Sequence, residues 1–190
     1  MNKIIFTLAA VMAMCLAACA QNKGEKSMQT ESKPLVVYFS ATGTTAQVAR
    51  AIAEATGGAL YEIAPRQAYT AADLDWNDRQ SRSSVEMNNP QARPALKDAT
   101  ADVAAHDVIF IGYPIWWDQA PRVINTFIES HDLKGKTLVP FATSGGSGIA
   151  NSVKALREAY PGLDWRDGKL LNGASRDAIR QWAGGAAAKR

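Results

Sequence analysis

Four hydroxyl side chains lie within six residues directly after an apolar run, in the segment Ser40-Ala41-Thr42-Gly43-Thr44-Thr45. Hydroxyls and successive backbone N–H groups at the start of a helix can surround a phosphate, and the helix dipole favours its negative charge. The segment has neither the Lys of an ATP-binding P-loop nor the G-x-G-x-x-G pattern of a dinucleotide site. It predicts a monophosphate site built from hydroxyls and amides. The alternative is that these residues only cap a helix.

A second segment gathers aromatic side chains, and it reads Gly112-Tyr113-Pro114-Ile115-Trp116-Trp117-Asp118-Gln119-Ala120-Pro121. Adjacent Trp residues cannot both be buried in a core, so at least one indole can offer a stacking face to a planar ring. In the alternative interpretation, one Trp packs on the fold and the other has no role.

A third segment, Thr143-Ser144-Gly145-Gly146-Ser147-Gly148, has three Gly in four positions. Such a backbone can lie close to a ligand and direct N–H groups at it, although a flexible connector has the same composition. His106 and His131 stand alone, without the spacing of metal ligands. We therefore predict no catalytic side chain and no metal site.

All three segments follow apolar runs that read as buried strands, which alternate with helical periodicity. Predicted strands are 35–39, 60–63, 108–111 (ended by Gly112), 138–142 and 169–171, and predicted helices are 45–56, one starting near Pro121, 149–160 and 175–183. The helix after Pro121 is expected to bury Val123, Ile124, Phe127 and Ile128. This alternation predicts an α/β fold with a doubly wound parallel sheet, in which ligands bind at the carboxyl ends of strands.

A phosphate cradle, an aromatic plate and an amide-rich Gly loop at one sheet edge suit flavin mononucleotide (FMN). The run Val36 to Thr45, with Ala49 four residues on, resembles the phosphate loop of the flavodoxin family, and the resemblance extends over about 34–183. It implies a flavodoxin-like five-stranded sheet of order 2-1-3-4-5, with helices on both faces and FMN as cofactor. The residues implied in FMN binding are Ser40, Ala41, Thr42, Gly43, Thr44, Thr45, Pro114, Ile115, Trp116, Trp117, Thr143, Ser144, Gly145, Gly146 and Gly148.

Three departures from flavodoxins that carry single electrons bear on function. Those carriers are strongly acidic, whereas this chain has 21 basic and 18 acidic side chains and a formal charge of +3. The third segment has no aromatic residue to cover the flavin. Trp117 stands where a Gly is frequent, and its side chain makes a positive φ more costly.

These departures favour an FMN-dependent oxidoreductase that transfers two electrons to quinone-like or other aromatic acceptors. The alternatives are a one-electron flavodoxin serving an envelope redox protein and a non-redox ligand-binding lipoprotein. The small positive charge does not indicate a nucleic-acid partner.

Residues 64–105 form a long connection that is either a lid over the ligand or a surface insertion. Tyr69, Asp73 and Trp76 within it are expected to pack or to reach over the flavin. Arg82, Glu86 and Arg93 are expected to form structural ion pairs.

The first eighteen residues are typical of an export signal, with Lys3 followed by an apolar run from Ile4 to Ala18. The run ends in Leu16-Ala17-Ala18-Cys19, which resembles the lipobox of bacterial lipoproteins. We predict a signal peptide over 1–18, a lipid-modified Cys19, a polar tether over 19–33 and a domain over 34–190. The lipid would hold the protein on the periplasmic face of a bacterial envelope membrane, with the outer membrane favoured. An ordinary secretory signal or an uncleaved anchor is the alternative.

Overall fold

The computed structural model describes residues 32–188, in which one parallel sheet runs in the order β2-β1-β3-β4-β5, with β6 also paired to β4. The strands are β1 (Leu35–Tyr38), β2 (Ala59–Glu62), β3 (Val108–Pro114), β4 (Thr137–Thr143), β5 (Asp164–Trp165) and β6 (Lys169–Leu170). The predicted doubly wound sheet and its strand order are confirmed.

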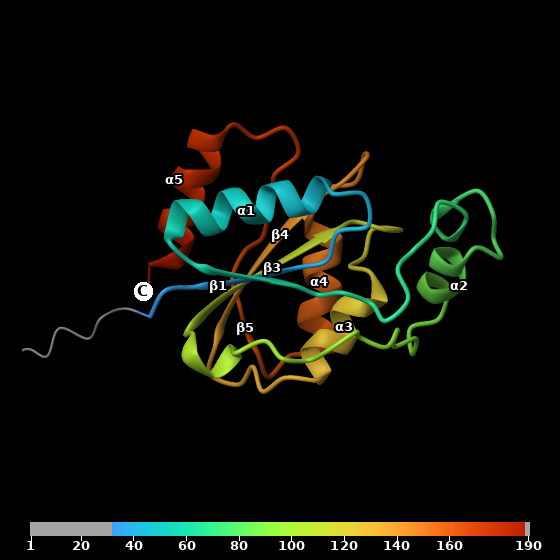
Figure 1. Ribbon diagram of the computed structural model, residues 1–190, viewed down its shortest axis with the longest axis horizontal. Coiled ribbons are helices and arrows are strands. Elements are labelled where there is room, and N and C mark those ends of the chain that lie inside the picture. Colours follow the sequence, from blue (N-terminus) through green and yellow to red (C-terminus); the bar gives the residue numbers. More distant parts are fainter. Residues whose placement is uncertain (1–31, 189–190) are drawn as a thin grey trace, which may run out of the picture. The chain divides into compact units, whose positions relative to one another are not determined.

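Helices cover both faces of this sheet (Figure 1). The helices are α1 (Thr44–Thr56), α2 (Arg82–Asn88), α3 (Arg122–Glu129), α4 (Ala150–Ala159) and α5 (Arg176–Ala187), with single turns at Ala72–Leu74 and Val103–Ala105. Side chains of α1 and α5 share one buried cluster with one sheet face, and those of α3 and α4 share a second cluster with the other. The four predicted apolar residues of α3 are all buried.

The fifth position of the sheet is split between β5 and β6, and Pro140 explains the break. Leu138 accepts a hydrogen bond from the Arg166 N–H (2.8 Å), and Ala142 accepts one from the Leu171 N–H (2.9 Å). Backbone groups of alternate residues point to the same side of a strand, so Pro140 faces the same neighbour but has no N–H to donate. A proline is tolerated in this central strand because the N–H that it lacks would face the gap between β5 and β6. Gly168 lies against Pro140 in this gap.

Gly112 does not end β3, contrary to the prediction, because the strand continues to Pro114. Gly112 pairs in register with Phe141 of β4, and a Cβ at position 112 would lie 2.1 Å from the Phe141 Cζ. The glycine is needed for this close approach of an aromatic ring rather than for a turn.

The 64–105 connection carries α2, which sequence periodicity did not reveal because the helix has only seven residues. In Figure 1 it lies beyond the carboxyl ends of the strands, at the edge where the three candidate segments emerge. Over residues 32–188, no helix has the length and apolar character needed to span a bilayer. The predicted signal peptide, Cys19 and the tether as far as residue 31 lie outside the described residues.

Candidate functional site

The first candidate segment forms an open helix start. Gly43 is the N-cap of α1 with φ +90°, and no side chain caps this helix within the described part of the chain. The Gly43 N–H instead donates to the Ser40 Oγ (3.1 Å), while Thr42, Gly43 and Thr44 are exposed. The simple capping interpretation is therefore not what the structure shows. The N–H groups of the first turn, which no side chain caps, and the hydroxyls of exposed Thr42 and Thr44 form a cradle that suits an anion.

Thr45 ties this segment to the third one. Its Oγ1 lies 2.8 Å from the Thr143 Oγ1 at the end of β4, and both residues are almost fully buried. A buried hydroxyl pair is costly to leave unmatched, so the bond sets the spacing of the two loops.

The third segment is held from outside by Asn172. The Asn172 Oδ1 accepts from the Ser144 N–H (2.6 Å), and its Nδ2 donates to the Ser144 carbonyl. Ser144 in turn accepts at Oγ from the N–H groups of Gly146 (3.1 Å) and Ser147 (2.8 Å). Gly145, Gly146 and Gly148 remain exposed, so this is an ordered turn rather than a free connector.

Sequence reasoning missed Asn172. The only signal was an amide residue directly after the predicted last strand, at the sheet edge where the candidate segments emerge.

The aromatic segment makes a two-residue hairpin turn. Trp116 and Gln119 exchange backbone hydrogen bonds (3.0 and 2.9 Å), and the residues between them, Trp117 and Asp118, have φ +46° and +59°. Positive φ at both central positions defines a type I′ turn. Trp117 therefore adopts positive φ in spite of the cost expected for its side chain, because the flanking hydrogen bonds hold the residue there.

The two Trp side chains have different environments. Trp116 is half-buried and makes edge-on contacts with Phe39 (centroids 5.6 Å apart) and Tyr69 (5.3 Å). Trp117 is 44% exposed, so it is the indole of the pair that is free to stack on a ligand. Of the other predicted residues here, Pro114 is half-buried, and buried Ile115 donates its N–H to the Thr143 carbonyl (2.8 Å).

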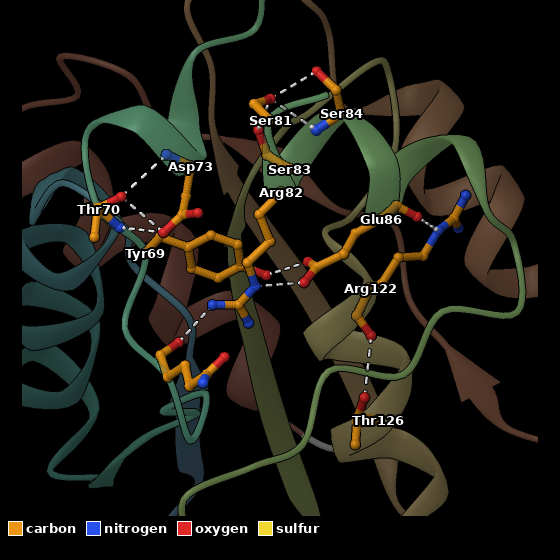
Figure 2. Close-up of polar contacts among 11 residues, drawn as sticks. Tyr69, Thr70, Asp73, Ser81, Arg82, Ser83, Ser84, Glu86, Arg122 and Thr126 are labelled. Carbon is orange, nitrogen blue, oxygen red and sulfur yellow. Dashed lines mark hydrogen bonds and ion pairs between the residues drawn. The ribbon is translucent and has the colours of Figure 1, made fainter. Parts of the chain in front are cut away.

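Tyr69 joins the 64–105 connection to this aromatic group through an ionic cluster, drawn in Figure 2. The Arg82 guanidinium lies 4.1 Å from the Tyr69 ring centroid and pairs with the Glu86 carboxylate (2.7 Å). The Tyr69 hydroxyl donates to the other Glu86 oxygen. Burial and the adjacent carboxylate raise the pKa of Tyr69 above its ordinary value, so the phenol stays protonated. Through Tyr69, the 64–105 connection is therefore held against the aromatic segment.

The other residues singled out in this connection have local roles. The Asp73 carboxylate accepts from the N–H and hydroxyl of Thr70 (both 2.8 Å), which lowers the pKa of Asp73 (Figure 2). Trp76 is 73% exposed, so the expectation that it packs is wrong. Arg93 pairs with Glu129 (2.7 Å). The expected Arg82 and Arg93 ion pairs are thus observed.

Neither histidine belongs to a cluster of potential ligands. The His106 Nδ1 lies 2.6 Å from the Lys33 carbonyl, and the His131 Nδ1 lies 2.9 Å from that of Phe127. Across residues 32–188, no three His, Cys, Asp or Glu side chains are grouped so that they could hold a metal ion.

The chain matches the family model for flavodoxin over residues 33–185. A candidate flavoprotein from Bacteroides eggerthii is 61% identical, with 84% of this chain and all of that one covered, at a TM-score of 0.80. Another from Bacteroides uniformis is 58% identical, with 81% and 99% covered, at a TM-score of 0.79. A Lactobacillus acidophilus flavoprotein in complex with FMN is 21% identical, with 77% of this chain and 98% of that one covered, at a TM-score of 0.58. None of the curated proteins matches.

Proposed function

Since the chain belongs to the flavodoxin family, we propose that it binds FMN and acts as an oxidoreductase on quinone-like or other aromatic acceptors. The observation that carries this proposal is the Thr45–Thr143 bond. It places an open anion cradle beside an exposed Gly-Ser turn, with no aromatic side chain in that turn to cover a planar ligand.

The phosphate of FMN fits the first segment on two observations. The first turn of α1 has no side-chain cap, and its N-cap residue is a glycine at φ +90°, around which nothing lies within 4 Å of a Cβ. The phosphate would be held by Ser40, Thr42 and Thr44 together with the N–H groups of the turn. The hydroxyl of Thr45, predicted as a fourth contact, is buried and bonded to Thr143 instead. The exposed residues of this group can reach a bound anion, while Thr45 positions the loop.

The ring system fits between the second and third segments. Trp117 offers an exposed indole on a turn of fixed backbone, and Gly145 and Gly146 offer an exposed backbone without side chains, in which the Gly146 N–H is already bonded to the Ser144 Oγ. Trp116 supports this turn through its contacts with Phe39 and Tyr69. We assign Trp116 to positioning and Trp117 to direct contact.

FMN, when bound, supplies hydride and electron transfer chemistry. The chain's part is to bind the cofactor, keep one ring face open and orient an acceptor, which receives two electrons and two protons to become a hydroquinone. The electrons come from an external reductant and the protons from water, so no acid or base side chain is required. Positioning then supplies most of the rate enhancement.

One-electron transfer to a redox protein is the second candidate, and the Trp117 backbone favours it. Because the turn already holds positive φ at residues 117 and 118, a side chain at 117 does not bar the backbone states that a glycine would allow there. Anaerobic reductive titration separates the two candidates. Reduction in a single two-electron step with turnover of quinones supports the enzyme, whereas two separated one-electron steps without quinone turnover support the carrier.

We further propose that the protein works at the bacterial envelope, anchored by lipid on Cys19. The support is the apolar run that ends in Leu16-Ala17-Ala18-Cys19 and the polar residues that follow it. In this arrangement the domain faces the periplasm, and its electron donor and acceptor must be available there.

A further inference from the structure

A cavity of about 340 Å³ lies between α3, α4 and the segment after α2. Leu156, Ala155 and Ala159 give it an apolar wall, and Arg122 and Asn125 give it polar groups. None of the fifteen residues expected to hold FMN lines it, so the cavity is separate from the site proposed above.

Arg122 is a buried cation without a carboxylate partner among residues 32–188. It is 7% exposed, and its guanidinium meets only backbone carbonyls, those of Met87 (Nη2, 2.9 Å) and Glu86 (Nε, 3.4 Å). Figure 2 shows the Glu86 contact, which joins the start of α3 to α2. Nη1 has no hydrogen-bond partner in this part of the chain. Nη1 is not among the fully buried polar atoms of the described residues that lack a partner, so it is accessible to an anion that enters the cavity.

Among the described residues, the one acidic side chain that lines the cavity is that of Glu129, and it is already engaged. Its carboxylate accepts from Arg93 Nε (2.7 Å) and Nη2 (2.8 Å) and from the Tyr160 hydroxyl (2.7 Å). These bonds lower the pKa of Glu129, so it stays ionised and neutralises Arg93. Burial and the Arg93 charge lower the pKa of Arg122, which still titrates far above neutrality. The three charges leave the cavity with one net positive charge.

We infer that this cavity is a binding site for a small organic carboxylate. The carboxylate pairs with Nη1 of Arg122, and its apolar body lies along Leu156 and the neighbouring alanines of α4. The volume is at the lower end of the range for ligand cavities, about 300–1,000 Å³, and suits an acid of roughly one aromatic ring.

Gln119 connects this site to the aromatic turn. It lines the cavity and exchanges backbone hydrogen bonds with Trp116, in the turn that exposes Trp117. A ligand in the cavity would therefore contact Gln119 and is expected to alter the fluorescence of the neighbouring indoles. This inference does not depend on the cofactor.

The test is titration of the purified full-length chain, with and without FMN, using benzoate, its neutral isostere benzamide and inorganic phosphate. Binding is followed by calorimetry and Trp fluorescence. We expect one benzoate site whose affinity does not change when FMN is present. Benzamide and phosphate should bind at least about tenfold more weakly, because benzamide lacks the negative charge and phosphate lacks the apolar body. Equal affinity for benzoate and benzamide, tighter binding of phosphate, or no benzoate binding at millimolar concentration overturns the inference.

Variants then locate the site. Arg122→Gln is expected to weaken benzoate at least about tenfold, whereas Arg79→Gln, at an exposed arginine outside the cavity, leaves it unchanged. Ala155→Leu keeps the charge but fills the apolar wall, and it should weaken benzoate to a similar degree. If Arg122→Gln fails to fold, Ala155→Leu decides. Wild-type affinity for benzoate in either folded variant contradicts the assignment.

Discussion

The Oγ1 atoms of Thr45 and Thr143 lie 2.8 Å apart although 98 positions separate the residues in the chain. Thr45 belongs to the first turn of α1, and Thr143 is the last residue of β4. The pair joins the anion cradle to the Gly-Ser turn through two nearly fully buried hydroxyls. The spacing of the two halves of the proposed FMN site is therefore set by a bond that no ligand needs to touch.

Replacing one member of this pair should cost more than replacing both. Thr143→Val leaves the Thr45 hydroxyl buried and unmatched, and we expect a loss of about 1–3 kcal/mol in the free energy of unfolding. The double variant Thr45→Val with Thr143→Val should recover part of that loss, because two methyl groups can pack. Urea unfolding curves of the wild type, Thr45→Val, Thr143→Val and the double variant measure the coupling. Strictly additive effects would show that the bond contributes nothing.

Phosphate recognition is tested at Gly43, with Gly145 as its matched control. Both positions have open space around a Cβ, but only Gly43 has positive φ. Gly43→Ala should destabilise the loop by about 1–2 kcal/mol and weaken FMN, whereas Gly145→Ala should leave stability nearly unchanged. Wild-type apoprotein should also bind FMN much more tightly than riboflavin, because charge-assisted hydrogen bonds to phosphate are lost. Fluorescence titration checks both points, and equal affinity for the two flavins contradicts a phosphate cradle.

Backbone strain and ring contact can be separated at Trp117. Trp117→Gly and Trp117→Val both remove the indole, so both should weaken FMN by about 0.5–1.5 kcal/mol, or several-fold. Only the Val variant should destabilise the apoprotein, by about 1–2 kcal/mol, because a β-branched residue tolerates positive φ poorly. Asp118→Gly, in the same turn, relieves positive φ but keeps the ring, and its FMN affinity should match the wild type. Titration and thermal unfolding together decide whether the indole is a contact.

The Tyr69 phenol should make stability depend on pH in the alkaline range. Its pKa is raised in the folded protein, so the folded state retains a proton that the unfolded chain releases near pH 10. Stability from this group is complete below about pH 10 and declines as the pH rises further.

Tyr69→Phe should therefore show a shallower loss of stability than the wild type above about pH 10. Urea midpoints measured from pH 8 to 11 provide the test. If the urea midpoints of the wild type and Tyr69→Phe run parallel with pH, the contact with Glu86 does not keep the Tyr69 phenol protonated. Tyr160→Phe serves as a comparison, since burial and the Glu129 carboxylate raise the pKa of Tyr160 to about 12.

Lipid attachment is tested at Cys19. The wild-type protein should be recovered in the membrane fraction, with an intact mass that corresponds to cleavage before Cys19 and addition of acyl chains. Cys19→Ala should lack that mass increment, and its domain should no longer be held by lipid. A Cys19→Ala protein that is cleaved yet still wholly membrane-bound would rule out lipid as the anchor.

Much of the fold could be predicted from local sequence because burial imposes a period. Apolar runs such as 35–39 and the helical spacing of Val123, Ile124 and Phe127 each depend on a few neighbouring residues. The anion cradle at the start of α1 could also be predicted from neighbouring residues, because the helix start and its hydroxyl side chains lie within one turn of chain. Gly112 was misread because its requirement comes from Phe141, on another strand.

Only the tertiary structure decided which residues meet across the sheet edge. Nothing local in the sequence links Thr45 to Thr143, or Asn172 to Ser144. The sequence did not show which of the two adjacent tryptophans is exposed, whereas in the fold Phe39 and Tyr69 contact Trp116 and Trp117 is left exposed. Arg122 likewise became an anion-binding candidate only because folding buried it without a carboxylate partner among residues 32–188. Charge pairing, burial and loop spacing depend on packing between distant elements, whereas periodicity depends on neighbours in the chain.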